Sequence, residues 1–274
     1  MRFVLLLLLL MPTFASAQAY GPEKPTTTPF GVAIATGTAG AAWSSERKFG
    51  HREGVTATPA DVWTGTANDY PFAIAPDVMR VAAGGDIADD AAGAGARSVT
   101  IVGLAAGTWA EAQETVATAG IGASAPTAQS FIRVFRCFVE DVGAYGASNV
   151  ADISVETTGG VELCHIQAAR SRSQMAIWTV PAGKTAWVVQ PAISVEGNFQ
   201  ASMVLNVRQS ADTVLAPFAP TVTLFEVDGL TGTSAFMKEV PIEVPGRSDV
   251  WWTATGAAGG IDVTIDTHFF MLAD

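Results

Sequence analysis

The sequence predicts an all-β protein: an antiparallel sandwich of jelly-roll-like type with an extended N-terminal arm. Two observations favour this class. The 274 residues include 27 Gly and 14 Pro, with 49% hydrophobic and only 15% charged residues, which is typical of short strands separated by turns. Apolar and polar residues alternate with a period of two along most of the chain, without intervening helical crossover segments. That pattern favours antiparallel sheets.

Residues 1–17 have the pattern of a secretory signal peptide. Arg2 supplies a positive charge, Val4 to Met11 form an apolar run, and Ala15-Ser16-Ala17 forms an A-x-A cleavage site. The run is too short for a transmembrane helix. We therefore expect export and cleavage before Gln18, the alternative being that Met11 starts the protein.

Residues 18–47 are predicted to form the extended arm. Their Pro, Thr and Gly content disfavours regular structure, because each Pro fixes φ and removes a backbone donor. We expect little regular structure before about Ala42. The stretch "KFGHREGVTATPADVWTG" from Lys48 to Gly65 then begins the folded part.

Successive strands are predicted from residue 97 onward. In "RSVTIVGL", Val99 and Ile101 alternate with polar neighbours. The stretch "GTWAEAQETVATAG" is rich in Glu and Ala, but it lies between strand patterns and is predicted as a strand. "VPAGK" around Gly183 and "VPGR" around Gly246 predict sharp corners. We divide the sandwich into residues 48–190 and 191–274, or treat it as one continuous domain. Further strands are predicted within residues 130–143, 149–160, 161–168, 174–195, 199–210, 221–229, 236–256 and 261–272.

Five stretches carry a resemblance to a known family. They are "KFGHREGVTATPADVW", "DDAAGAGARSVTIVGL", "SFIRVFRCFVEDVGAYGASNVADISV", "AIWTVPAGKTAWV" and "KEVPIEVPGRSDVWWTAT". In this order they resemble a family of virion structural proteins from tailed bacteriophages, often marine ones, from about Lys48 to Leu272. The loop "ATAGIGAS" and the N-terminal leader depart from the family's pattern. The resemblance implies a structural role on a particle.

Few residues suggest chemistry. The formal net charge of −11 argues against nucleic-acid binding, which depends on Lys and Arg. Asp86, Asp89 and Asp90 in a Gly-rich loop are weak candidates for calcium ligands, but turn carboxylates more often bond nearby backbone amides. The chain's three histidines lie far apart in sequence and form no metal motif. No nucleophile elbow, P-loop or dinucleotide fingerprint is present, so we expect neither enzymatic activity nor a cofactor.

Tryptophans are the candidate interaction residues, above all Trp63, Trp251 and Trp252. Trp251 and Trp252 are adjacent, and neighbours on a strand point to opposite faces. One of the two rings should therefore face away from the local core, toward a partner subunit or a glycan.

Cys137 and Cys164 are the only two cysteines. A disulfide would close a long loop in an exported chain. In a simple meander, however, the strand at residues 149–157 lies between them and separates their backbones by about 10 Å. We therefore predict two separate buried thiols.

These expectations combine into a non-enzymatic virion structural protein, a capsid-associated, decoration, fibre or tail component. Its partners would be copies of itself, with a trimer favoured, and other virion proteins. The alternative is a secreted bacterial β-sandwich adhesin or carbohydrate-binding module with a glycan partner. The protein would be located in the virion, or outside the cell if the leader is cleaved.

Overall fold

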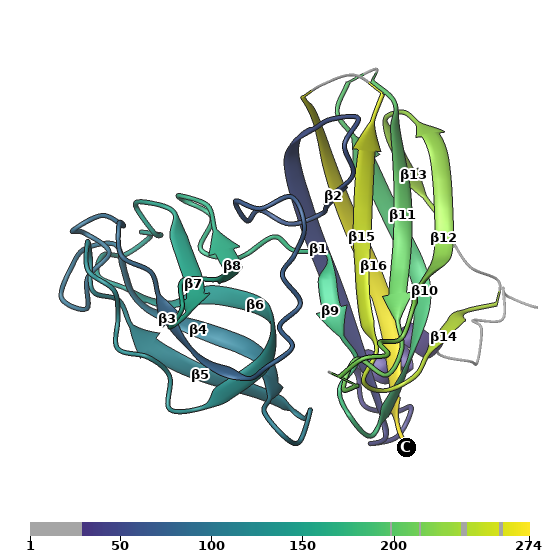
Figure 1. Ribbon diagram of the computed structural model, residues 1–274, viewed down its shortest axis with the longest axis horizontal. Coiled ribbons are helices and arrows are strands. Elements are labelled where there is room, and N and C mark those ends of the chain that lie inside the picture. Colours follow the sequence, from purple (N-terminus) through teal and green to yellow (C-terminus); the bar gives the residue numbers. More distant parts are fainter. Residues whose placement is uncertain (1–28, 198, 214, 237–239, 258–259) are drawn as a thin grey trace, which may run out of the picture.

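The computed structural model describes residues 29–197, 199–213, 215–236, 240–257 and 260–274. Within them the chain is almost entirely β-structure in two bodies (Figure 1), so the predicted all-β class is confirmed. The short helix α1 (Phe30–Ala35) precedes the first strand. None of the helices in the described ranges has the length and apolar character needed to span a membrane.

The larger body is a sandwich of two antiparallel sheets. The first sheet has the order β1-β16-β10, with β13 and β14 both paired to β10. The second has the order β12-β11-β15, with β2 and β9 both paired to β15. The bounds of the first sheet are β1 (Trp43–Val55), β10 (Lys184–Val195), β13 (Thr233–Ala235), β14 (Ile242–Val244) and β16 (Ile261–Ala273). Those of the second are β2 (Ala60–Asp61), β9 (Ile177–Thr179), β11 (Ala201–Arg208), β12 (Thr221–Leu230) and β15 (Asp249–Gly256).

The strand order of the sandwich is that of a jelly roll. When β2 and β9 count as one position and β13 and β14 as another, the ten strands fill eight positions, four in each sheet. The corner between β9 and β10 contains Gly183 with φ +70°, a conformation that glycine adopts without steric cost. The predicted turn at this position is confirmed.

The smaller body is one curled sheet inserted between β2 and β9, here called the insert. Its order is β5-β4-β6-β3-β7-β8, and the stretch predicted as strand rather than helix forms β5. The strands are β3 (Asp77–Val81), β4 (Ala96–Ala105), β5 (Glu111–Ala117), β6 (Ser130–Val142), β7 (Ile153–Thr157) and β8 (Glu162–Ile166).

The insertion corrects the predicted division of the chain. A boundary between residues 190 and 191 falls inside β10, a strand paired with β16 along its length. The sandwich instead combines residues from both ends of the folded chain, because β1 pairs with β16 from Trp43 to Val55. Sequence order does not separate the two bodies, since the insert interrupts the sandwich.

The predicted arm is also shorter than expected. Of residues 18–47, the part up to residue 28 lies outside the described residues, as does the predicted signal peptide. The remainder contains α1 and the first residues of β1. Trp43 pairs with Leu272, so the chain is already within the sheet before Lys48.

Two hydrophobic clusters form the core. One fills the sandwich, where alternate residues of β11 such as Met203, Leu205 and Val207 are buried, as a strand with one inward face requires. The other fills the insert and continues into the sandwich through Met175, Ile177 and Trp251. The two bodies therefore share a buried apolar contact.

Candidate functional site

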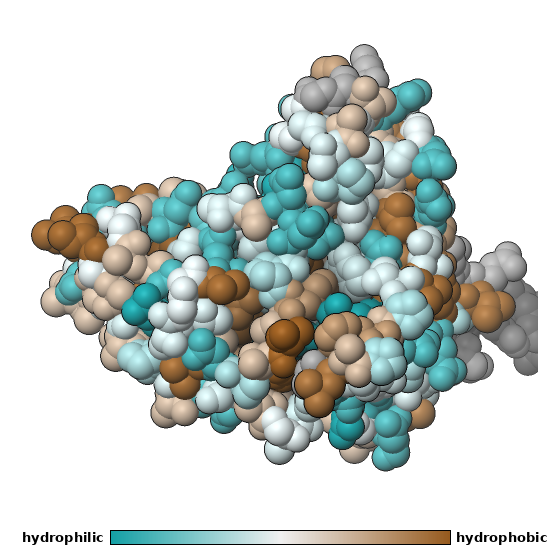
Figure 2. Space-filling model, viewed as in Figure 1, coloured by the Kyte–Doolittle hydropathy of each residue, from teal (hydrophilic) through white to brown (hydrophobic). Residues whose placement is uncertain are grey.

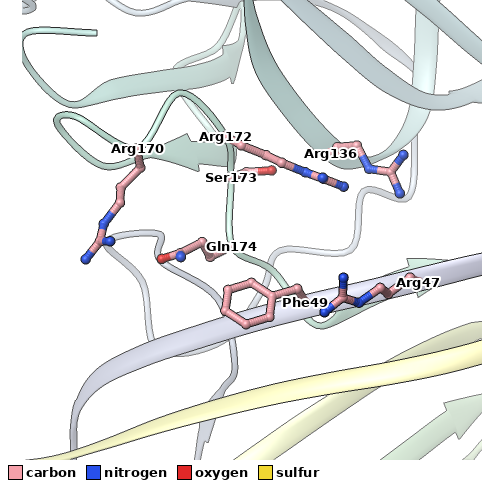
Figure 3. A pocket seen from close by; sticks show the side chains of 7 residues that line it. All are labelled: Arg47, Phe49, Arg136, Arg170, Arg172, Ser173 and Gln174. Carbon is pink, nitrogen blue, oxygen red and sulfur yellow. The ribbon is translucent and has the colours of Figure 1, made fainter. Parts of the chain in front are cut away.

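A pocket of about 400 Å³ lies where the insert meets the sandwich. Figure 3 shows the side chains around it: Arg47 and Phe49 come from β1, Arg136 from β6, and the others from the segment between β8 and β9. Seven residues line it: Arg47, Phe49, Arg136, Arg170, Arg172, Ser173 and Gln174. Four of these are arginines, in a chain with only 15 Lys and Arg and a net charge of −11. Among the described lining residues there is no carboxylate.

The segment 167–176, here called the connector, builds the pocket by pairing with both bodies. On the insert side, the Ser173 amide donates to the Cys137 carbonyl (2.9 Å) and Ser173 Oγ accepts from the Cys137 amide (3.0 Å). On the sandwich side, the Gln174 carbonyl accepts from the His51 amide of β1 at 3.4 Å, and the Ala176 carbonyl accepts from the Trp252 amide of β15 at 3.2 Å. These bonds fix the connector backbone between the two bodies.

Gly50 allows β1 to approach the connector. A Cβ built on Gly50 would lie 2.4 Å from the Ala176 nitrogen and 2.5 Å from its Cβ, well inside van der Waals contact. A glycine is therefore needed here for close approach of the backbones rather than for an unusual φ. It keeps the β1 side of the pocket, with Arg47 and Phe49, near the connector.

Two of the four arginines have carboxylate partners. Arg47 makes a bidentate contact with Asp266 of β16, with Nε 2.8 Å from Oδ1 and Nη2 2.5 Å from Oδ2. This hydrogen bond and the charge of Asp266 raise the pKa of Arg47. Arg136 donates to Glu46. The same Glu46 oxygen lies 3.1 Å from Nζ of Lys48, so this one carboxylate serves two cations.

Lys48 lines a small adjoining cavity that shares Arg47, Arg136 and other residues with this pocket, and only 4% of its side chain is exposed. Its Nζ is 4.3 Å from the centre of the Phe135 ring, a cation–π contact. Burial lowers the pKa of Lys48 to about 8, although Glu46 opposes the shift. The Lys48 ammonium is therefore a positive charge at a buried position where the loss of solvation disfavours it.

Arg172 and Arg170 differ from the other two. Within the described part of the chain, neither guanidinium has a hydrogen bond or an ion pair. Burial lowers the pKa of Arg172, and the charges of Arg136 and Arg47 lower it further, while Glu46 raises it. In Figure 3 the Arg172 side chain extends toward Arg136. Positive charge at Arg172 is thus incompletely balanced in the folded protein.

The three aspartates predicted as weak calcium ligands make backbone hydrogen bonds instead. Asp89 is buried and accepts from the amides of Ala96 (2.8 Å), Val150 (2.9 Å) and Ala151 (2.9 Å). Asp86 and Asp90 each accept from the amide two residues later. The described residues contain no group of three or more His, Cys, Asp or Glu suited to a metal ion.

The predicted interaction role of the three tryptophans is wrong, because all three are buried. Trp252 lies inside the sandwich, where its Nε1 donates to Thr267 Oγ1 at 2.9 Å. Trp251 does point to the opposite face, but the insert covers that face, and the ring contacts Phe72 at 5.0 Å between centroids. Trp63 is fully buried beside Tyr70. The sequence could not show that a second body covers the sheet.

The prediction of two separate thiols is also wrong. Cys137 and Cys164 form a disulfide, with a Cα–Cα distance of 6.2 Å. The predicted meander fails because β3 lies between β6 and β7 in the sheet, and the sheet curls until β8 contacts β6. The two cysteines therefore face each other across the core of the insert.

A second polar cluster surrounds His165 of β8. Its Nδ1 lies 2.8 Å from Glu162 Oε1 and 3.2 Å from Ser154 Oγ. In a Ser–His–acid catalytic triad the serine and the acid contact opposite ring nitrogens, whereas here both contact the same nitrogen. Burial raises the pKa of Glu162, but hydrogen bonds from His165, Ser154 and Thr66 outweigh it and lower the pKa to about 2. The cluster is a hydrogen-bonded network around a stable carboxylate.

Sequence reasoning missed the arginine pocket. Its residues lie in three separate stretches, "SSERKFG", "RVFRCF" and "AARSRSQ", each unremarkable alone. A local excess of cations in an acidic chain was the available signal, strongest at Arg170 and Arg172. Only the pairing of the connector with both bodies brings the stretches together.

Comparison with known proteins gives no family. No protein-family model matches the chain. No curated protein matches it either. A solved structure titled "Structure of infectious bursal disease virus Gt strain" aligns with 90% of this chain and 86% of that chain at 8% identity. Its TM-score is 0.15, and the likeness carries no argument about fold or function.

Proposed function

We propose that this chain is a non-enzymatic structural protein of a virus particle, of the tailed-bacteriophage type that its sequence resembles, and that it assembles with copies of itself. The jelly-roll order of the sandwich is compatible with this role, because viral capsid domains commonly use it. Lectin domains use it as well, so the fold alone does not decide the function.

The observation that carries the proposal is the edge of the sandwich at β12. In the described ranges, β12 pairs with β11 on one side and with no strand on the other. It is ten residues long, and most of its side chains are exposed or half-buried. A long strand at the edge of a sheet can pair with a strand of another chain.

Apolar side chains accompany this edge strand. Leu215 is 79% exposed, Phe218 57% and Val222 50%, so exposed apolar groups lead along the chain into β12. On the face in Figure 2, apolar groups are interspersed with polar ones over both bodies. Apolar surface at an edge strand is a suitable contact for a second copy of the chain, and closed symmetric oligomers, a trimer first, are the expected product.

Light scattering on the purified mature chain tests the proposal. We expect a stable trimer at micromolar concentration and a shift toward monomer in Val222→Lys, because a charge on an edge strand opposes pairing. Ile121→Lys is the matched control, since Ile121 is 68% exposed on the insert. A monomeric wild-type protein would contradict self-assembly. Electron microscopy of labelled particles tests the virion location separately.

One observation favours the alternative of a secreted adhesin or carbohydrate-binding module. Trp43 and Trp187 are only partly buried, with ring centroids 5.5 Å apart, and Phe30 and Phe270 lie beside them. Aromatic rings with an exposed face can stack on sugars. Binding to a neutral-glycan array that is lost in Trp187→Ala, with a monomeric protein, would favour this alternative.

A further inference from the structure

We propose that the pocket between the two bodies binds a sulfate or phosphate ester carried on a small molecule such as a sugar, with Arg172 as its main ligand. The proposal is independent of self-assembly. It rests on the charge balance, the composition and the size of the pocket.

The charge balance predicts an anion. Five cations gather here: Arg47, Arg136, Arg170 and Arg172 line the pocket, and Lys48 lines a small adjoining cavity. Asp266 pairs with Arg47, and Glu46 is shared between Arg136 and Lys48, so positive charge remains in excess. A group of like charges without compensation is costly in a folded protein and is relieved by a bound counter-charge.

The residue type indicates an oxyanion. Guanidinium groups bind phosphate, sulfate and carboxylate oxygens through paired N–H donors, and such charge-assisted bonds are among the strongest in proteins. The guanidinium groups of Arg172 and Arg170 have no hydrogen bond or ion pair among the described residues, so their donors are available. An excess of more than one positive charge favours a dianionic or strongly acidic oxyanion over a single carboxylate.

The shape of the pocket favours a small carrier over a long polymer. A volume of about 400 Å³ lies in the range of small-molecule sites. Phe49 lines the pocket and is 38% exposed, so it offers apolar surface to the ring that carries the anion. The chain as a whole is acidic, with a net charge of −11, and this charge repels an extended polyanion such as nucleic acid.

Arg170 has a secondary role in the proposal. It also lines an adjoining pocket together with Glu53 and Asp152, and the negative charges of these two carboxylates partly offset the positive charge of Arg170. Its side chain extends away from Arg172 in Figure 3. We therefore expect Arg170 to contact the sugar or a second anionic group of the ligand rather than the ester group that Arg172 binds.

The experiment is calorimetry on the mature chain at constant ionic strength, with inorganic sulfate, inorganic phosphate, a sulfated disaccharide, its unsulfated form and a short duplex DNA as probes. We expect the sulfated disaccharide to bind most tightly and the unsulfated form not to bind. Arg172→Gln should weaken binding about tenfold or more, since a charge-assisted bond is lost. Arg170→Gln should have a smaller effect.

Arg247→Gln is the matched control. It removes the same charge from an exposed ion pair with Asp212 in the sandwich and should leave binding unchanged. Arg172→Gln should also melt no lower than wild type without ligand, because the Arg172 charge is not balanced in the fold. Equal weakening of sulfated-disaccharide binding by Arg172→Gln and Arg247→Gln would show a non-specific charge effect and overturn the proposal.

Three further outcomes would overturn it as well: no measurable binding of any anionic probe, binding of the inorganic ions but no gain from the attached sugar, or tight binding of duplex DNA that Arg172→Gln abolishes. The first outcome would show that the pocket does not bind anions. The second would show that the attached sugar does not contribute to binding, and the third that the ligand is a nucleic acid. None of them depends on the oligomeric state, so they are distinguishable from failure of the proposed function.

Discussion

Arg133 of β6 and Asp249 of β15 form a buried ion pair that joins the insert to the sandwich. Arg133 Nε lies 2.8 Å from Asp249 Oδ1 and Nη2 lies 3.0 Å from Oδ2, with 3% and 0% of the two side chains exposed. The same carboxylate accepts from Thr179 Oγ1 at 2.6 Å and from Arg208 Nη2 at 2.5 Å. One carboxylate therefore organises groups from β6, β9 and β11.

Asp249→Ala should strongly destabilise the protein. The change leaves two arginines without their carboxylate, one of them buried, and removal of one partner of a buried pair costs about 3–5 kcal/mol. Urea unfolding measures the loss. Asp212→Ala is the control, because Asp212 pairs with Arg247 at the surface, where such pairs contribute about 0–1 kcal/mol. Equal losses in the two variants would count against a structural role for the buried pair.

The disulfide should stabilise the insert. Cys137 and Cys164 are 27 residues apart, and closing a loop of that size restricts the unfolded chain by about 3–4 kcal/mol on the entropic account. The double variant Cys137→Ala/Cys164→Ala should lose roughly that free energy of unfolding in urea. Thiol titration under denaturing, non-reducing conditions should find no free thiol in the wild type. Two free thiols per chain would refute the bond.

Gly50→Ala should destabilise the junction by about 1–3 kcal/mol or more, the usual cost of inserting a methyl group where no space exists. The new Cβ would overlap the Ala176 backbone, which is fixed by a hydrogen bond to the Val62 carbonyl at 2.8 Å. Thermal unfolding measures the effect. Gly159→Ala is the control: the nearest atom to its Cβ would be Thr157 Oγ1 at 3.6 Å, and little change is expected there.

Lys48 should make stability depend on pH in the alkaline range. Its pKa falls from 10.5 in the unfolded chain to about 8 in the folded protein, chiefly through burial. Between these values the unfolded chain binds the extra proton, so the free energy of unfolding should rise with pH across this window. The rise is on the order of 3 kcal/mol.

Lys48→Met should remove this dependence and unfold at higher urea than wild type at neutral pH. Lys184→Met, which removes a lysine without an ion pair in the described structure, is the control and should retain the alkaline rise. A wild-type curve that is flat from pH 8 to 10.5 would disprove the buried charge.

Local sequence determined the strands. Alternating residues such as Val99 and Ile101, and the Pro and Gly punctuation near Gly183, specify where a strand runs and where it turns, because side-chain period and φ preference are properties of neighbouring residues. The antiparallel sandwich class follows from those elements. The β5 assignment succeeded for the same reason, since its neighbours in the chain were strands.

Tertiary structure decided which strands pair, and it therefore decided where every site lies. The insert separates β1 in sequence from the strands with which it forms a sheet, and it covers the face of Trp251. Its curled sheet joins Cys137 to Cys164, and its contact with the sandwich brings Arg47, Arg136 and Arg172 to one pocket. These contacts join residues far apart in sequence, and a strand's own pattern states which face is buried but not what buries it. The free energy gained by burying apolar surface between the two bodies selects which faces pack together, and this gain exists only in the complete fold.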